Sequence, residues 1–439
     1  MSDRTISSLV LTRFRPDQPA GGAALRNWQN IQALSRLGPV DVVSIGDVAH
    51  TEPVEVVRHW QAFVPEPIAN RLGGLNRWRP TLEGLERTRH PVLDAFHCPA
   101  AARWIEARLS SHAYDIVVVE ELALALYLRT IVRSGTRVVF DAHNVEADLR
   151  REMAAKRKLG HSWRGRLRTR LLGRRLREVE RRAVRAADLI WVCSEVDADA
   201  LRRAYRPSAP ITVVPNGVDV AAYRPHHAVR VDADWSDHPL TLMYPGAFSY
   251  YPNEEAALCL IKRVLPLVRR RHPEARAVLV GRDPTPAMLA AADNDPGIIV
   301  TGTVPSVLPF FEPPCVVTLP ITLGSGTRLK ILEAFAAARP VISTRKGAEG
   351  IAATDGRELF LRNDPGEMAE GAIQLWHSSA LRRSLCDNAL QLVLTRYSWE
   401  TAAQRIKASL AAIQSEKPLS VGQLHATAPA PAATPPSSP

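Results

Sequence analysis

The sequence predicts an α/β protein built from two doubly wound domains that face each other across a cleft. Three observations support this prediction. The chain has 439 residues, more than a single hydrophobic core usually holds. Short β-branched runs alternate with helical stretches along nearly the whole chain, as in parallel sheets covered by helices on both faces. Apolar periodicity lapses in a polar stretch from Pro225 to Pro239, which marks the break between the domains.

Strands are expected where a short apolar, β-branched run ends in a turn. In the first domain, residues 1–225, these runs are Ser8 to Leu11, Asp41 to Ile45, Asp115 to Glu120, Arg137 to His143, Leu189 to Ser194 and Ile211 to Pro215. In the second domain, residues 240–396, they are Thr241 to Tyr244, Arg276 to Val280, Ile298 to Gly302, Val316 to Pro320, Val341 to Thr344 and Leu359 to Arg362. Residues 226–239 are expected to be a linker, residues 397–417 a helix that crosses back to the first domain, and residues 418–439 a disordered Pro/Ala-rich tail.

The composition indicates a soluble, cytoplasmic protein without a metal site. Hydrophobic residues make up 46% of the chain, which is enough to fill two cores. No run reaches the roughly 18 uncharged apolar residues of a membrane span, and Met1 to Val10 lacks the features of a signal peptide. The five cysteines stand singly, without the paired spacing of zinc or redox motifs, so we expect reduced core residues. The acidic pair Asp232 and Asp234 lies in the linker and is expected to be solvated.

The net charge of +11 comes from one segment. Between Arg150 and Arg185 there are fifteen Lys and Arg residues and three Glu, so the rest of the chain is close to neutral. Apolar residues recur in this segment at three- and four-residue intervals, which predicts one helix with an apolar stripe and a cationic remainder. The helix could pack on the first domain with a solvated face, or dock on anionic lipid headgroups. Nucleic acid is not the expected partner, because the basic excess is confined to one segment.

The strongest motif begins where the strand ending at Pro320 leads into a glycine-containing loop and then into a helix that starts near Leu329. A helix start offers unpaired backbone N–H groups and a partial positive charge, which suit a phosphate. Gly324 and Gly326 would let this backbone approach an anion without a Cβ in the way. The loop therefore predicts a phosphate site, with Ser325 and Thr327 as its other members.

Charged side chains follow directly along the chain. Arg328 and Lys330 lie beside the helix start and would neutralise a diphosphate. Glu333 comes about one helical turn later, within reach of a ribose whose hydroxyl groups need an acceptor. The order of these groups predicts a site for a nucleotide diphosphate, although an ordinary surface pair of Lys330 and Glu333 is the plainer alternative.

These residues resemble the donor signature of family 4 retaining glycosyltransferases. The matching segments are Gly324-Ser-Gly-Thr-Arg-Leu-Lys-Ile-Leu-Glu-Ala-Phe-Ala-Ala-Ala-Arg-Pro-Val-Ile-Ser-Thr344, Gly347-Ala-Glu-Gly350, Pro215-Asn-Gly-Val-Asp219, Tyr244-Pro-Gly-Ala-Phe-Ser-Tyr-Tyr-Pro-Asn253, Val280-Gly281 and Tyr397-Ser-Trp399. The resemblance covers roughly Leu9 to Ile413. It implies the GT-B fold with two Rossmann-like domains, a nucleotide-diphosphate sugar as donor substrate, and no tightly bound cofactor. It also implies that Gly246 and Glu349 contribute to donor binding.

The sequence departs from the family pattern in two places. Relatives carry two glutamates eight positions apart, but here Ser325 occupies the first position and only Glu333 remains. Because the first glutamate contacts the transferred sugar in relatives, the identity of the sugar cannot be carried over. Relatives also take a diphosphate-binding Arg and Lys from the loop that corresponds to Ala247 to Asn253, which has neither. We therefore expect Arg328 and Lys330 to replace them, Arg328 foremost, since a guanidinium binds phosphate through two parallel hydrogen bonds.

Two features of the first domain should face the cleft. Gly21 and Gly22 permit a tight turn before a helix from about Ala24 to Leu37 that carries Arg26, and the resemblance assigns such a turn to the donor phosphates and the acceptor; a plain turn is nearly as good an interpretation. His143 ends a strand, and ligands collect at the carboxyl ends of parallel strands. The resemblance implies that this histidine positions the donor sugar or polarises its hydroxyl groups, rather than acting as a free base.

The sequence thus predicts transfer of a sugar from a nucleotide-diphosphate sugar to a glycan or lipid-linked acceptor, with retention of configuration, in polysaccharide or glycolipid biosynthesis. The cations and helix amides would stabilise the leaving phosphate, which removes the need for a bound metal. Domain closure would exclude water. The protein would act in the cytoplasm or on the inner face of the membrane. The alternatives are a nucleotide-sugar epimerase with the same two domains and a non-catalytic sugar-nucleotide binder.

Overall fold

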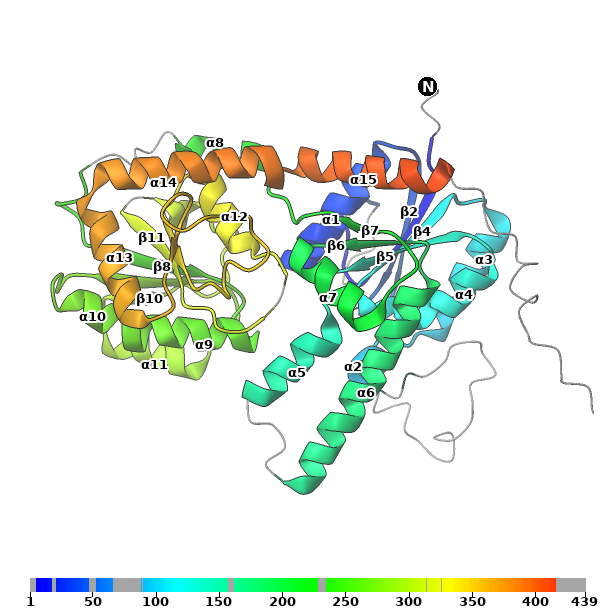
Figure 1. Ribbon diagram of the computed structural model, residues 1–439, viewed down its shortest axis with the longest axis horizontal. Coiled ribbons are helices and arrows are strands. Elements are labelled where there is room, and N and C mark those ends of the chain that lie inside the picture. The colour runs from blue at the N-terminus through cyan, green and yellow to red at the C-terminus, as the bar shows by residue number, and fades with distance from the viewer. Residues whose placement is uncertain are drawn as a thin grey trace, which may run out of the picture.

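The computed structural model describes residues 5–17, 21–46, 53–65, 88, 90–156, 162–227, 234–312, 314–324 and 326–415. It contains two α/β domains, each with a parallel sheet covered by helices (Figure 1). The prediction of two doubly wound domains is confirmed. The predicted tail at residues 418–439, and residues 228–233 of the predicted linker, lie outside the described residues.

The N-terminal sheet has seven strands in the order β3-β2-β1-β4-β5-β6-β7. Their bounds are β1 (Ser8–Thr12), β2 (Val40–Ile45), β3 (His59–Phe63), β4 (Ile116–Glu120), β5 (Arg137–Ala142), β6 (Leu189–Val192) and β7 (Ile211–Val213). Every pairing is parallel. Strand β3 was not expected from the sequence. It is an edge strand with partly buried residues throughout, so its sequence, His-Trp-Gln-Ala-Phe, has no continuous apolar run to reveal it.

Alternate residues of these strands enter two separate cores, one on each face of the sheet. Val10, Val118 and Trp191 pack against α1 (Gly22–Ser35) and α15 (Trp399–Ser415). Residues such as Leu11 and Phe140 pack on the opposite face. That face is covered by α3 (Pro99–Ser111), α4 (Leu128–Arg133), α6 (Trp163–Ala186) and α7 (Glu195–Tyr205).

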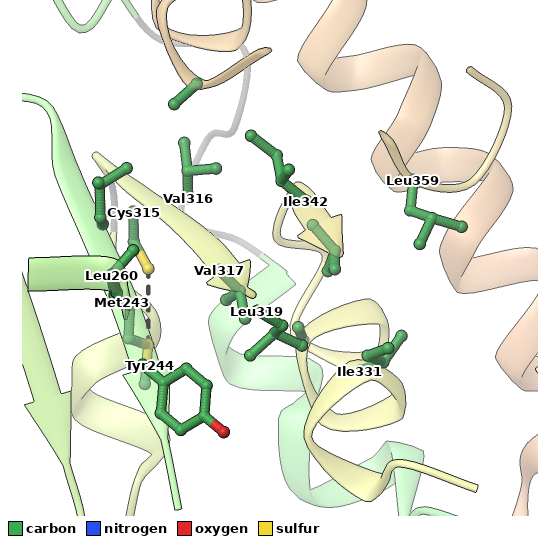
Figure 2. Packing of buried hydrophobic residues seen from close by; sticks show 14 of the residues in the cluster. Met243, Tyr244, Leu260, Cys315, Val316, Val317, Leu319, Ile331, Ile342 and Leu359 are labelled. Atoms are coloured by element: carbon green, nitrogen blue, oxygen red, sulfur yellow. Dashed lines mark hydrogen bonds between the residues drawn. The ribbon is translucent and has the colours of Figure 1, made fainter. Parts of the chain in front are cut away.

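The C-terminal sheet has six parallel strands in the order β10-β9-β8-β11-β12-β13. Their bounds are β8 (Thr241–Pro245), β9 (Arg276–Val280), β10 (Ile298–Val300), β11 (Cys315–Leu319), β12 (Val341–Ser343) and β13 (Phe360–Leu361). The covering helices are α9 (Tyr251–Cys259), α10 (Leu265–Arg269), α11 (Pro286–Asn294), α12 (Leu329–Ala336), α13 (Pro365–His377) and α14 (Ser379–Leu392). Figure 2 shows core side chains of β8 and β11 beside Ile331 of α12, which fixes the start of that helix against the sheet.

Helix α15 connects the two domains. It follows α14 of the C-terminal domain and lies across the N-terminal domain (Figure 1). Its residues Ala402, Ile406 and Leu410 are buried in the N-terminal core. At its first residue, the Trp399 indole donates a hydrogen bond of 3.2 Å to the Gly217 carbonyl. The chain therefore crosses twice between the domains on the same side of the cleft.

The predicted helix is found for the apolar residues from Trp163 to Ala183, but its extension back to Arg150 is wrong. The segment contains two helices, α5 (Glu146–Lys156) and α6 (Trp163–Ala186). Ser162 caps α6, because its hydroxyl accepts a hydrogen bond of 3.1 Å from the Gly165 N–H. Among the helices within the described ranges, none has the length and apolar character that a membrane crossing requires.

Candidate functional site

The carboxyl ends of the two sheets meet around the loop that follows β11. The Thr327 hydroxyl donates to the Cys193 carbonyl, which follows β6, at 3.2 Å. The Asn216 amide donates to the Thr327 carbonyl, also at 3.2 Å. A Cβ added at Gly350, after β12, would lie 3.1 Å from the Ser194 side chain. The predicted phosphate loop therefore lies against the strand ends of the N-terminal domain, and Thr327 uses its hydroxyl for that contact.

Both described glycines of this loop have positive φ, 109° at Gly324 and 76° at Gly326, which favours glycine over other residues. A Cβ at Gly326 would lie 3.2 Å from the His143 carbonyl oxygen and 3.1 Å from Asn144 Oδ1. The loop and the predicted histidine strand end are thus neighbours across the domain boundary. Ser325 lies outside the described residues.

Helix α12 begins directly after the loop, with Arg328 at the capping position. The Arg328 side chain does not cap the first turn, and the Ile331 N–H bonds to the Arg328 carbonyl at 3.0 Å, so an anion would be bound by the N–H groups that precede Ile331. The Arg328 guanidinium folds back along the loop, where Nη2 donates to the Leu323 carbonyl at 3.3 Å. A Cβ at Gly324 would come within 2.5 Å of the same Nη2. The glycine therefore makes room for the arginine.

Lys330 is held by two residues at the start of the C-terminal domain. Its Nζ donates to Tyr244 Oη at 3.0 Å and to Asn253 Oδ1 at 2.9 Å. A Cβ at Gly246 would lie 3.1 Å from the same Nζ, so the missing side chain leaves space for the amine. Burial, together with the charge of Arg328, lowers the pKa of Lys330 to about 7. The amine is therefore close to half-protonated at neutral pH.

Glu333 is partly buried and hydrogen-bonds to Tyr223 of α8 (Val220–His227). Burial raises the pKa of Glu333, while the charge of Lys330 and the tyrosine hydroxyl oppose the shift. A carboxylate that keeps one hydroxyl partner in this position can accept another from a ligand. The sequence analysis did not identify Tyr223 as a site residue. It lies in α8, beyond the last predicted strand of the first domain, where no strand end points to a ligand site.

The remaining predicted donor residues lie on both sides of the cleft. Glu349 is paired with Lys346, with Nζ 2.6 Å from Oε2, in the loop after β12. Gly21 has a φ of 114°, and a Cβ there would lie 3.9 Å from Arg282 Nη2 of the C-terminal domain. A Cβ at Gly22 would lie 3.3 Å from Leu329 Cδ1. Arg282 follows Gly281 at the end of β9, so the strand-end rule could have identified it as a further cation of the cleft.

His143 lies in a cluster of three carboxylates at the ends of β4 and β5. Its Nε2 is 3.1 Å from Glu120 Oε2 and 3.3 Å from Asp141 Oδ2, and its Nδ1 is 3.3 Å from Glu121 Oε1. Burial by itself would lower the pKa of His143, but these carboxylates outweigh it and raise the pKa well above its usual value. The carboxylates therefore favour the protonated imidazole, which argues against a role as a free base. His143 follows the carboxyl end of β5, and its carbonyl faces Gly326 of the C-terminal domain.

The three carboxylates differ in charge because their surroundings differ. Asp141 is fully buried, yet Arg26 and His143 hold its pKa far below the usual range. Burial and the Asp141 charge raise the pKa of Glu120 to about 8, so its carboxyl is neutral at pH 7. Glu121 is bound by Arg13, whose Nη2 donates at 3.0 Å, and it has an unusual φ of 71°. This residue, with its strained backbone, contacts Nδ1 of the histidine, whereas Glu120 and Asp141 contact Nε2.

Arg26 supports the cluster from α1. Its Nε donates to Asp141 Oδ2 at 2.8 Å and its Nη2 to Oδ1 at 2.6 Å. Its Nη1 donates to the Val214 carbonyl and to Asn216. Glu120, Asp141 and His143 lie close enough together to hold a metal ion. We interpret them as a hydrogen-bonded cluster, because Asp141 is already paired with the Arg26 guanidinium and both ring nitrogens of His143 contact carboxylates.

Two family models match the chain, one to each domain. The model described as "Glycosyltransferase Family 4" matches residues 20–222, and the model described as "Glycosyl transferases group 1" matches residues 239–378. Together they cover most of both domains, which agrees with the sequence resemblance.

Two solved structures and one curated protein illustrate the similarity. HepE from Anabaena, in complex with UDP, has a TM-score of 0.62 at 15% identity and covers 93% of this chain and 100% of its own. Sucrose-phosphate synthase from Thermosynechococcus elongatus has a TM-score of 0.66 at 15% identity, covering 93% and 99%. A lipopolysaccharide 1,2-N-acetylglucosaminetransferase from Salmonella typhimurium is 24% identical over 46% of this chain and 56% of its own. The chain thus spans about half the length of the curated relatives that it matches.

Proposed function

The chain belongs to the group 1 glycosyltransferases, with a family 4 domain in its N-terminal half, and we propose that it transfers a sugar from a nucleotide-diphosphate sugar to a glycan or lipid-linked acceptor. The donor would bind at the start of α12. The UDP in the complex of HepE supports a uridine nucleotide. The curated relative named as a lipopolysaccharide 1,2-N-acetylglucosaminetransferase supports a role in polysaccharide or glycolipid biosynthesis.

One observation carries this proposal: Gly326, two residues before the cap of α12, lies against the His143 strand end, where an added Cβ would be 3.2 Å from the His143 carbonyl oxygen. A diphosphate at α12 would meet Arg328, Lys330 and backbone N–H groups, while the attached sugar would extend toward His143. Glu333 would accept a ribose hydroxyl, one turn farther along the same helix. Gly246 and Glu349 would line the donor pocket, and Gly21 and Gly22 would close it from the other domain.

In the proposed reaction the bond between the anomeric carbon and the phosphate oxygen breaks, and a bond to the acceptor oxygen forms. The acceptor proton leaves with the nucleoside diphosphate. Arg328, Lys330 and the helix amides would stabilise the charge that develops on the leaving phosphate, so that no metal is required. His143, whose two ring nitrogens both contact carboxylates, would pack against the sugar ring and orient it. The family resemblance supports retention of the anomeric configuration.

Product analysis tests this function. The full chain is incubated with a panel of nucleotide sugars and polyprenyl-linked or oligosaccharide acceptors, and the products are identified by mass spectrometry. We expect a glycoside and an equal amount of nucleoside diphosphate from one donor. An isomeric nucleotide sugar would identify an epimerase instead, and donors recovered intact from every mixture would favour a non-catalytic binder.

Donor binding should take up a proton through Lys330. Its pKa of about 7 lies below the usual value because of burial, and a bound diphosphate would favour the charged form. Affinity should therefore be highest below pH 7 and fall as the pH rises through 7, by up to about tenfold per pH unit. Calorimetric titration of a nucleotide sugar, whose diphosphate has no proton to lose in this range, measures the effect in buffers of different ionisation enthalpy.

The matched control for this titration is Lys330→Gln, which keeps a hydrogen-bonding side chain but cannot titrate. Its affinity should be lower and almost independent of pH, and it should take up no proton. An unchanged pH profile in the variant would place the diphosphate away from Lys330.

A further inference from the structure

The N-terminal half of α6 has the exposure of a docking surface. From Trp163 to Arg175 no side chain is buried, and Leu176 is the first that is. Figure 1 shows this end of α6 projecting away from the N-terminal domain. Trp163 is 65% exposed, Leu167 49% and Leu171 44%. The projecting part of the helix gains little stability from packing on the domain. A group of exposed apolar residues in such a position is typical of an interaction surface.

These three apolar residues form a line along the helix. They are four residues apart, and residues at this spacing lie on the same side of an α-helix. The stripe continues inward to the buried residues that anchor the other half of α6 in the N-terminal core. The anchored half fixes the orientation of the exposed half, so the line of Trp163, Leu167 and Leu171 has a defined direction relative to the domain.

Arginines surround this line. There are seven between Ser162 and Arg177 and no acidic residue, and all seven are exposed: Arg164, Arg166, Arg168, Arg170, Arg174, Arg175 and Arg177. Arginine is suited to phosphate because its planar guanidinium offers parallel hydrogen bonds. A surface of this composition is complementary to an array of anionic phosphates above an apolar layer.

The helix also borders two hollows that meet at Arg175. One, of about 450 Å³, is lined by Trp163, Leu167 and Leu171 together with arginines of the same half of α6. The other, of about 560 Å³, lies between α4 and α6 and is lined by Leu126, Val132 and Val179, with Arg129 and Arg182 among its other residues. Arg175 lines both, and Glu178 is the one acidic residue among the described lining residues of the two hollows.

We propose that the exposed half of α6 docks the protein on a membrane surface rich in anionic phospholipids. The arginines bind lipid phosphates, and Trp163, Leu167 and Leu171 enter the boundary between headgroups and acyl chains, where tryptophan is favoured. A nucleic acid would match the arginines but would leave the apolar line exposed. The combination of both features favours the lipid surface.

Docking at α6 would bear on the cleft through α5. Glu180 of α6 accepts hydrogen bonds from the N–H groups of Glu146, at 2.7 Å, and Ala147, at 3.2 Å, which start α5. Helix α5 follows His143 closely in the chain, and its Lys156 pairs with Glu255 of the C-terminal domain at 2.8 Å. The docked helix is thus connected to both sides of the cleft. This part of the inference rests on the proposed function, because it presents the cleft to a lipid-linked acceptor.

Vesicle sedimentation tests the inference without donor or acceptor, so its outcome is independent of whether transfer is observed. The full chain is mixed at low salt with vesicles of phosphatidylcholine, with or without phosphatidylglycerol. We expect at least about tenfold stronger binding to the anionic vesicles, falling steeply with added salt. Equal binding to both compositions, or none to either, would overturn the proposal.

Two variants and one control locate the surface. Replacement of Trp163, Leu167 and Leu171 by Ser should weaken binding about tenfold or more through lost apolar burial. Arg168→Glu with Arg170→Glu and Arg174→Glu should abolish the preference for anionic vesicles. The control changes charge equally at exposed residues of the C-terminal domain, Lys262→Glu, Arg263→Glu and Arg270→Glu. Equal losses in control and α6 variants would contradict docking by α6, as would a duplex oligonucleotide that binds α6 more tightly than the vesicles.

All four proteins should keep the same thermal midpoint, because the substituted residues are not buried. Each should also keep its turnover with a water-soluble acceptor, since none of these residues lies at the cleft. Loss of turnover with a vesicle-bound acceptor alone, in the α6 variants, would support the connection between docking and acceptor access. Full turnover on vesicles despite lost binding would overturn that connection.

Discussion

Replacing Arg328 by Ala should lower kcat by about 10² to 10³-fold, which corresponds to roughly 3 to 4 kcal/mol of lost transition-state stabilisation. Arg328 is the capping residue of α12, and its guanidinium lies along the preceding loop, close enough to Lys330 to lower the pKa of that amine. Charge develops on the leaving diphosphate in the transition state. Loss of the Arg328 guanidinium should therefore lower kcat more than it weakens donor binding. Initial rates over a range of donor concentrations separate the two effects.

Two variants make the Arg328 experiment specific. Arg328→Lys keeps the charge but loses the paired hydrogen bonds, and it should recover only part of the rate. Arg263→Ala removes an exposed arginine of the same domain, away from the cleft, and should leave kcat unchanged. The thermal midpoint of each protein shows that the fold is intact. Turnover of Arg328→Ala at the wild-type level with saturating donor would remove the arginine from the site.

The second large effect is expected on stability. Replacing Asp141 by Ala should destabilise the N-terminal domain by about 3 to 5 kcal/mol, because it leaves the Arg26 charge buried without its partner. Arg26 and Asp141 are both almost fully buried, with two hydrogen bonds between them. Urea unfolding followed by tryptophan fluorescence reports this change, since Trp191 lies in the same core.

An exposed ion pair of the same domain provides the control. Arg36 and Glu400 join α1 to α15 at 2.8 Å and are both mostly exposed, so Glu400→Ala should change the stability by less than about 1 kcal/mol. The Asp141 contribution should also depend on pH. Because its folded pKa is depressed, the stabilisation is complete above about pH 4 and is lost as the pH falls below that value. An Asp141→Ala variant as stable as wild type would contradict the cluster.

The sequence predicted those parts of the fold that have a local signal. Strands β8, β9 and β11 follow apolar runs, and α12 begins at Leu329 where a glycine loop ends. Strand β3 was not predicted because it is an edge strand whose residues are only partly buried. Its five residues are too few to show a clear alternation of apolar and polar side chains. The two helices at residues 146–186 were merged into one because their charge and apolar spacing are similar on both sides of the break.

The site could be predicted where its residues are adjacent in sequence and not where the fold assembles them. Arg328, Lys330 and Glu333 lie on one short segment, so their order was informative. The fold brings together three charged residues that are distant in sequence: Glu120 of β4, Asp141 of β5 and Arg26 of α1. Arg26 and Asp141, for example, are 115 residues apart in the chain. Glu120 and Asp141 end strands beside His143, so the strand-end rule could have found them once the strand order was known.

In the proposed function, a nucleotide-diphosphate sugar reacts in the cleft at the start of α12. Product analysis of the full chain and Arg328→Ala side by side, with the same donor panel and acceptors, tests it most directly. We expect a glycoside and an equal amount of nucleoside diphosphate from the wild type, and only traces of both from the variant. Donors that remain intact or isomerise with the wild type, or equal products from the two proteins, would contradict it.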